Sequence, residues 1–148
     1  MTDSQRELAA QTFNAAWNLI DQSERTSEEE RQMLTLACAS RALWEGIGGA
    51  EQKVTGDWQV AHVASLLGHA SLALEFANAA YEEASTSDVP TWLLASTCEG
   101  LARAHATAGH VDETGIWIEH AQRLLASVDD PDDRAVVEGQ LASIPSAQ

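Results

Sequence analysis

Two ten-residue stretches decide the fold: VAHVASLLGH at residues 60–69 and LARAHATAGH at residues 101–110. Each is an alanine-rich, apolar run that ends in Gly-His, with the glycine at Gly68 in the first and at Gly109 in the second. Apolar residues recur at helical spacing on both sides of each glycine, and glycine tolerates the positive φ at which helices end. Each stretch therefore predicts the turn of a helical hairpin.

Reading outward from these turns predicts an all-α fold of about seven helices in a single domain. Three antiparallel hairpins and a short C-terminal capping helix are separated by Gly46-Ile47-Gly48-Gly49, by a loop at 85–90 and by Asp129-Asp130-Pro131, which is typical of a new helix start. The first two helices are expected to begin at capping boxes, Ser4 with Glu7 and Ser27 with Glu30. The predicted hairpins span about 4–46, 50–84 and 91–127, and the capping helix spans 131–144.

The second and third hairpins match each other when the sequence is shifted by the spacing from Gly68 to Gly109, which we call the repeat offset. Ala61 then maps onto Ala102 and Ala80 onto Ala121, and a weaker upstream match places Trp17 on Trp58. Small residues at such positions allow helices to pack closely. An internal repeat of helical hairpins is typical of solenoid proteins, in which each unit packs on its neighbours.

The chain resembles the tetratricopeptide family over about residues 5–128. The family's Leu-Gly pair and second-helix alanines fall on Val60-Ala61, Ala73, Ala77 and Ala80, then on Leu101-Ala102, Thr114, Ile118 and Ala121. The chain departs from the family in its longer period, in Ala64 and His105 where an aromatic is expected, and in lacking the closing proline. The resemblance implies a right-handed array that binds a peptide or protein along its concave face. A plain antiparallel helical bundle is the alternative.

The composition limits the partners. The formal net charge is −15, which disfavours nucleic acids and anionic membranes, because both are bound through Lys and Arg. A basic or neutral partner is expected, unless the acidic residues only keep the domain soluble. Cys38 and Cys98 lie in apolar helical runs without metal-ligand spacing and are expected to be buried free thiols. With no signal-peptide pattern at the N-terminus, the expected location is cytoplasmic.

The resemblance places a candidate groove on the first helix of each hairpin. Its residues are Asn14, Trp17 and Asp21 on the first helix, Trp58, His62 and Ser65 on the third, and Glu99 and Arg103 on the fifth. Two indoles and an arginine suit a peptide or a small polar ligand, because Trp gives a large contact area and Arg holds carboxylates. The competing interpretation is that Trp17 and Trp58 are core residues between neighbouring first helices, since large apolar residues at helical spacing are usually core.

Neither a metal site nor a catalytic site is predicted. Five histidines are present, but none pairs with another at the i,i+3 or i,i+4 spacing of helical ligands, and His-Glu-x-x-His is absent. Gly-x-Ser-x-Gly and a phosphate-binding loop are also absent, so no cofactor is expected. The acidic run at 129–133 lacks the order of a calcium loop.

The sequence therefore predicts a non-enzymatic module that binds a protein or peptide. One alternative is a small-ligand sensor or enzyme, with a closed pocket between the first, third and fifth helices that encloses His62 and has Asp21 or Glu99 as its charged partner. Another is a structural homodimer, for which Ile116 and Trp117 on the sixth helix are the candidate contacts.

Overall fold

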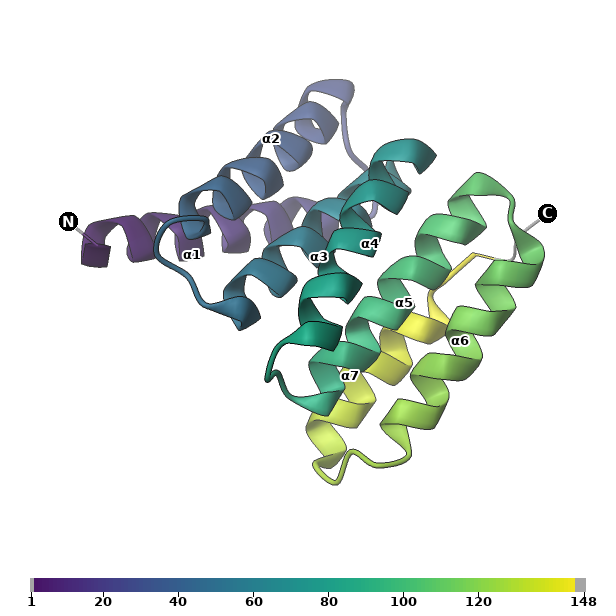
Figure 1. Ribbon diagram of the computed structural model, residues 1–148. Helices are drawn as coiled ribbons and strands as arrows, with labels where there is room; N and C mark the ends of the chain where they lie inside the picture. The colour runs from purple at the N-terminus through teal and green to yellow at the C-terminus, as the bar shows by residue number, and fades with distance from the viewer. Residues whose placement is uncertain (1, 146–148) are drawn as a thin grey trace.

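The computed structural model describes residues 2–145 and consists of α-helices joined by short loops (Figure 1). The helices within this range are α1 (Thr2–Ile20), α2 (Ser27–Trp44), α3 (Ala50–Leu66), α4 (Ala70–Thr86), α5 (Thr91–Ala108), α6 (Val111–Leu125) and α7 (Pro131–Ala142). No strand occurs among the described residues, and the predicted all-α fold is confirmed.

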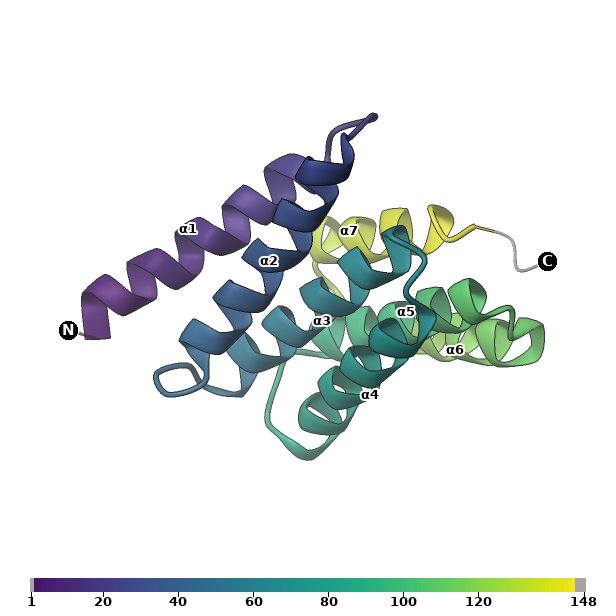
Figure 2. The same ribbon diagram turned by 90° about the horizontal axis from the view of Figure 1, so that it is seen from above.

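Consecutive helices pack against each other along the whole described chain. α1 packs on α2, α3 on α4 and α5 on α6, and each of these hairpins also contacts the next one. The helix α7 packs mainly on α5 and less on α6. Figure 2 shows α1 and α7 on one side of α3 and α5, with α4 on the other side. This arrangement is compatible with a helical repeat, since every helix contacts its neighbours in sequence.

Alanine dominates the packed interior. Around Leu101, the buried contacts between α3, α4 and α5 come from Ala61, Ala64, Ala73, Ala77 and Ala104. Larger residues form a second cluster where α1, α2 and α3 meet, around Met33, Val60 and Val63. Side chains as small as alanine let helix axes approach closely, which explains why the alanine-rich runs of the sequence become buried helix faces.

The two glycine turns have the same backbone geometry. Gly68 has φ 78° and Gly109 has φ 80°, the left-handed region that favours glycine. In each turn the amide of the following histidine bonds back across six residues, from His69 to the carbonyl of Ala64 (2.8 Å) and from His110 to that of His105 (2.9 Å). This is the Schellman ending of a helix.

Two of the predicted helix starts differ from the structure. The helix α1 begins at Thr2, so Ser4 lies inside it. The capping box of α2 is formed by Thr26 and Glu29, one residue earlier than predicted. Thr26 and Ser27 both stand three residues before a glutamate, and it is Thr26 that takes the extended conformation a cap requires. The predicted start of the last helix is close, since Asp130 caps α7 and Pro131 is its first residue.

The remaining helix ends lie within about two residues of their predicted positions. The helix α4 continues to Thr86, while α6 begins at Val111 and ends at Leu125. Among the described residues, no helix has the length and apolar character needed to cross a membrane.

Candidate functional site

The side of α3 and α5 that faces α1 and α7 carries a stack of aromatic rings. The Trp17 and Trp58 rings lie 5.8 Å apart and nearly parallel, at 27°. The imidazole of His62 lies 5.0 Å from Trp58 and 5.7 Å from Trp17. Trp58 is buried and Trp17 is half-buried. The two tryptophans that match at the repeat offset are thus in contact across α1 and α3.

A chain of polar contacts continues from the stack into α5 and α7. Trp58 Nε1 donates to Glu99 Oε1 at 3.1 Å, and Glu99 Oε2 accepts from Arg103 Nε at 2.9 Å. Arg103 also donates from Nη2 to the carbonyl of Gln140 (3.0 Å) and to Ser143 Oγ (2.6 Å). The Glu99 side chain is fully buried and that of Arg103 is 4% exposed. The end of α7 therefore covers the ion pair.

Burial changes the acid–base behaviour of two groups in this cluster. It raises the pKa of the Glu99 carboxyl, against the opposing effect of the Arg103 charge and of the hydrogen bonds from Arg103 and Trp58. Burial, with a smaller contribution from the Arg103 charge, lowers the pKa of His62 to about 3. His62 is therefore neutral at pH 7, and its buried Nδ1 atom makes no hydrogen bond with the described residues.

Two hollows that share lining residues lie beside the aromatic stack. The hollow between α1, α3, α5 and α7 has a volume of about 160 Å³ and is lined by Phe13, Trp17, Thr55, Trp58, Trp92, Leu93, Ser96, Val136 and Gln140. The second, of about 220 Å³, is lined by Ala10, Phe13, Asn14, Trp44, Glu51, Gln52, Thr55 and Gly56. Because both include Phe13 and Thr55, they adjoin, and we call them together the aromatic groove. Four of the five tryptophans line it.

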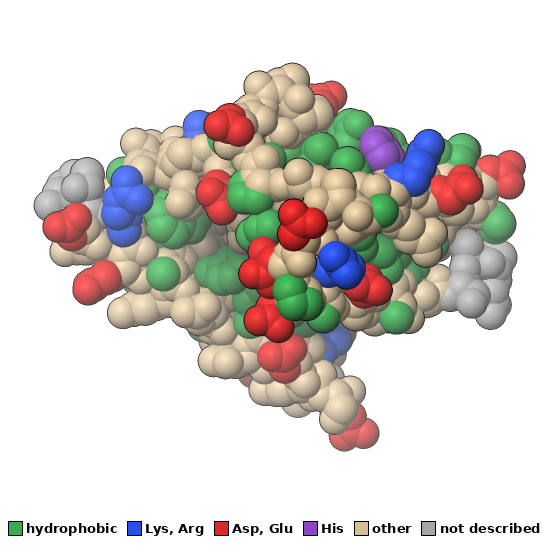
Figure 3. All heavy atoms as spheres, turned by 90° about the horizontal axis from the view of Figure 1, so that it is seen from below, with side chains coloured by type: hydrophobic (Ala, Val, Ile, Leu, Met, Phe, Trp, Pro, Cys, Tyr) green, Lys and Arg blue, Asp and Glu red, His purple; other side chains and the backbone are tan. Residues whose placement is uncertain are grey.

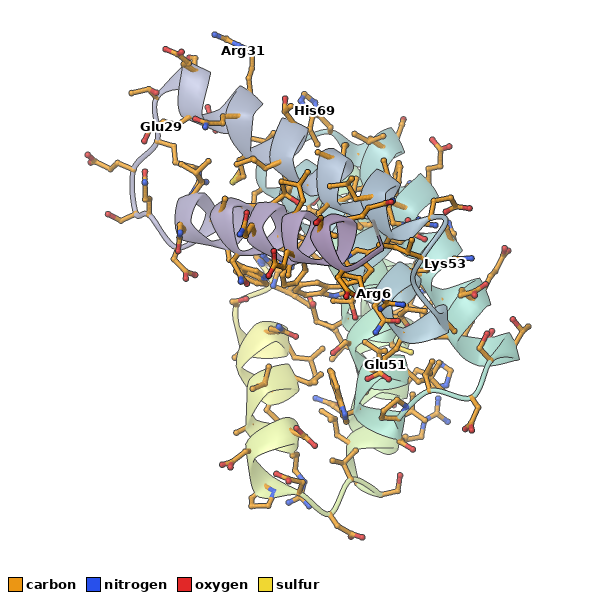
Figure 4. All side chains as sticks on the ribbon, turned by 90° about the vertical axis from the view of Figure 1, so that its left-hand side faces the viewer. Arg6, Glu29, Arg31, Glu51, Lys53 and His69 are labelled. Carbon is orange, nitrogen blue, oxygen red and sulfur yellow. The ribbon has the colours of Figure 1, made fainter. Side chains whose placement is uncertain are left out.

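Charged residues lie at the edges of the aromatic groove. At the α1–α2 end, Arg6 donates to the carbonyl of Ile47 at 2.8 Å and lies over the Trp44 ring at 6.0 Å. Figure 4 shows Arg6 and Glu51 at this end of the molecule. On α7, Asp133 precedes Val136 and Gln140 by three and seven residues and therefore shares their helix face. Figure 3 shows hydrophobic side chains on this side of the molecule, with acidic side chains gathered beside them.

The sequence-predicted groove residues fall into two groups. Asn14, Trp17 and Trp58 line the aromatic groove. Glu99, Arg103 and His62 are buried beside or beneath it and contact one another or the tryptophans, so their side chains are not open to a ligand. The other two predicted residues differ: Asp21 is exposed just after the end of α1, and Ser65 is half-buried, with a hydroxyl that makes no hydrogen bond within residues 2–145.

Several lining residues were not predicted from the sequence. They belong to α7, to the start of α5, and to the neighbouring turns of α1 and α3: Phe13, Thr55, Trp92, Ser96, Val136 and Gln140. Trp92 had a usable signal, because a tryptophan two residues after Pro90 stands in the first turn of a helix, next to the loop. No signal in the sequence placed α7 across α5.

The two predicted dimer contacts differ in exposure, and so do the two cysteines. Ile116 is 59% exposed, whereas the Trp117 ring packs within the chain, 4.9 Å from Tyr81 and 5.6 Å from His120. Cys98 is buried, as predicted, but the prediction for Cys38 is wrong, because this thiol is exposed. Cys38 follows the buried Ala37 by one residue and so points away from the contact face of α2.

A second cluster of chemically active side chains lies at the turn between α5 and α6. Nδ1 of His105 and Nδ1 of His110 are 3.0 Å apart. One ring nitrogen of each imidazole and a carboxylate oxygen of Glu113 all lie within 4.8 Å of one another. Two imidazoles and a carboxylate are suitable ligands for a transition-metal ion. The structure thus brings together histidines that the sequence-based test for helical ligand pairs had separated.

No protein-family model, no curated protein and no solved structure matches this chain.

Proposed function

We propose that the protein is a non-enzymatic interaction module, of the tetratricopeptide-like kind, that holds a peptide segment of a partner protein in the aromatic groove. One observation carries the proposal: four of the five tryptophans line two adjoining hollows on one side of the helical array. Aromatic side chains are enriched where proteins bind partners, because they give a large contact area at a low cost in conformational entropy.

The shape of the aromatic groove supports a peptide over a small molecule. Each of its two hollows, of about 160 and 220 Å³, is by itself smaller than the roughly 300–1,000 Å³ typical of pockets that enclose drug-sized ligands. Because they adjoin along α1 and α3, they offer successive positions for the side chains of an extended chain. Such a segment would place apolar side chains against Trp44 at one end and Trp92 at the other.

The charges support a partner segment with basic flanks. Asp133 lies one turn before Val136 on the wall that α7 contributes, whereas at the other end Glu51 lines the hollow with Arg6 over the neighbouring Trp44 ring. The preference for a basic residue is therefore strongest at the α7 end. The chain as a whole carries a net charge of −15, which attracts cationic partners and speeds their association. Nucleic acids and anionic membranes do not suit this surface. The two cysteines are unpaired, which suits a cytoplasmic protein.

The sensor or enzyme alternative would use His62 with Glu99 as its charged partner. Against it, Glu99 is already paired with Arg103, and the buried His62 ring packs against both indole rings. The homodimer alternative depends on α6, where Ile116 is exposed but Trp117 is packed within the chain. The aromatic groove remains the surface whose residues best fit recognition.

A displayed peptide library tests the proposal directly. Peptides selected on the wild-type protein are then measured against Val136→Arg, which puts a long cation into the aromatic groove, and against Val111→Arg as the matched control. Both valines are 57% exposed, so both variants should fold, which circular dichroism would check. We expect Val136→Arg to weaken binding by about tenfold or more, since interface anchors are worth upwards of about 1.4 kcal/mol, and Val111→Arg to leave it unchanged.

Two results would contradict the proposal. One is a set of selected peptides that bind both variants as well as they bind the wild type, which would place their site elsewhere. The other is a selection that yields no peptide with measurable affinity, which would remove the support for peptide recognition.

A further inference from the structure

The turn between α5 and α6 holds three potential metal ligands close together. Nδ1 of His105 lies 3.0 Å from Nδ1 of His110, and a carboxylate oxygen of Glu113 completes a group whose ligand atoms all lie within 4.8 Å of one another. His105 is half-buried, whereas His110 and Glu113 are exposed. An ion could therefore reach the group from solvent without any opening of the fold.

The helix ending dictates that the two imidazoles meet. In a Schellman ending, the residue two places beyond the helix end packs on the residue five places before it, usually through an apolar contact. Here the His110 amide bonds to the His105 carbonyl at 2.9 Å, and the Gly109 amide bonds to that of Ala106 at 3.1 Å. Two histidines take the place of that apolar pair. Glu113 then lies one turn after His110 on α6, on the same side of the helix.

We propose that His105, His110 and Glu113 form a binding site for a divalent first-row transition ion such as Zn²⁺. The ion is held by Nδ1 of both imidazoles and by a carboxylate oxygen, and water completes its coordination. Histidine and carboxylate suit these ions, and two nitrogens bound at about 2.0–2.1 Å to one tetrahedral ion lie roughly 3.3–3.4 Å apart. The rings need to separate by only a few tenths of an ångström from their present positions.

The turn between α3 and α4 provides an internal comparison. It has the same backbone, with Gly68 at φ 78° and the His69 amide bonded to the Ala64 carbonyl at 2.8 Å. At the repeat offset, however, Ala64 stands for His105 and Leu72 stands for Glu113, so only His69 remains. The fold thus builds this turn without needing histidine at the first position. The ligand group is therefore an addition to the turn and not a requirement of it.

Binding would link α5 to α6 across the turn. An ion that binds the folded chain and not the unfolded one raises the midpoint of thermal unfolding as its free concentration rises above the dissociation constant. Because three protein ligands leave positions to water, the site resembles an open metal site more than a closed structural one. This inference is independent of the aromatic groove, whose lining residues are all different.

The test is a calorimetric titration of tag-free protein with ZnCl₂, repeated with CoCl₂ to follow the visible absorption of the bound ion. His105→Ala reproduces the residue found at Ala64 in the other turn, so it should fold; Glu113→Gln removes the carboxylate; His69→Gln is the control. We expect one ion per chain for wild type and His69→Gln. We expect at least about a tenfold loss of affinity for His105→Ala and Glu113→Gln, because even loss of an outer-shell partner costs that much. The ¹⁵N spectrum of the imidazoles should show both Nδ1 atoms shifting on zinc addition.

Two results would overturn the proposal. The first is wild-type protein that takes up no Zn²⁺ or Co²⁺ at millimolar concentrations. The second is an affinity that His105→Ala leaves unchanged or that His69→Gln abolishes, since either would assign the ion to other ligands.

Discussion

Trp58 and Glu99 stand at the same position relative to their turns, at equal distances before Gly68 and Gly109, and they are hydrogen-bonded to each other at 3.1 Å. Positions that match in sequence thus meet in space across the α3–α5 contact. The aromatic member lies at the edge of the groove, and the acidic member lies in the interior. The buried Glu99 carboxylate is consequently neutralised by Arg103, and the stability of the fold should depend on this ion pair.

Removing Arg103 should destabilise the protein severely. Arg103→Met leaves the buried Glu99 carboxyl without its cation, and breaking a buried pair in this way costs about 3–5 kcal/mol. Urea denaturation at pH 7 would measure the loss, with Arg123→Met at an exposed position as the control. The double variant Glu99→Gln/Arg103→Met should recover much of the stability, since no charge is then buried. A loss below about 1 kcal/mol for Arg103→Met would show that the pair is weaker than its burial implies.

His62 should make the protein sensitive to acid. The pKa of His62 is lowered by burial to about 3, against 6.5 for the free side chain. The unfolded chain therefore binds this proton more readily, and stability that is present above pH 6.5 is lost as the pH falls towards 3, at about 1.4 kcal/mol per pH unit. His62→Phe keeps a ring in the stack and has no such proton. At pH 4.5 relative to pH 7, it should lose about 2–3 kcal/mol less than the wild type. Equal losses in urea denaturation would contradict this, and His69→Gln serves as the control.

Two helical glycines should respond in opposite ways to alanine. A Cβ at Gly100 would lie 3.1 Å from Cδ1 of Trp58, whose ring is already held by Trp17 and Glu99, so Gly100→Ala should cost about 1–3 kcal/mol through overpacking. A Cβ at Gly115 would meet nothing within 4 Å, so Gly115→Ala should stabilise α6 by about 0.5–1 kcal/mol. Thermal unfolding would measure both variants against the wild type, and the midpoint should fall for Gly100→Ala and rise for Gly115→Ala.

Two alanine substitutions test which residue caps the start of α2. Thr26 accepts from the Glu29 amide at 3.1 Å, and Glu29 accepts from the Thr26 amide at 2.9 Å. Thr26→Ala should therefore cost about 1 kcal/mol, while Ser27→Ala, just inside the helix, should change stability by a few tenths at most. If Ser27→Ala proved the costlier change in denaturant titrations, the cap would lie one residue later.

The helices could be predicted because their signals are local. Gly68 and Gly109 end helices by their own conformational freedom, and Asp130 with Pro131 starts one by chemistry confined to a single turn. The two starts that were mispredicted, at Ser4 and Ser27, are cases in which neighbouring residues offer competing caps or none is needed. Such choices depend on differences of a few tenths of a kcal/mol.

The candidate site could be predicted only in part, because its far wall is a tertiary feature. The repeat offset was enough to group Trp17, Trp58 and Glu99 on one face. It could not show that α7 crosses α5, covers Arg103 and supplies Val136 to the groove, because no local pattern states where a short last helix docks.

Separation along the chain also hid the pair of His105 and His110. Histidines five apart do not share a helix face, so the spacing rule for helical ligands passes over them. Only the reversal of the chain at Gly109 brings the two imidazoles together.

The side-chain hydrogen bonds that join the helices connect residues that are close in sequence, and this affects how the protein folds. Gln59 donates to the carbonyl of Phe13, 46 residues away, and no side-chain hydrogen bond found among the described residues spans more. Each of these hydrogen bonds between helices thus joins a helix to one at most two helices further along the chain. Contact order is low in such a topology, so the chain should fold fast for its size, on the microsecond-to-millisecond scale of helical bundles. It could also nucleate at any of its three hairpins, and it would open from its ends inwards.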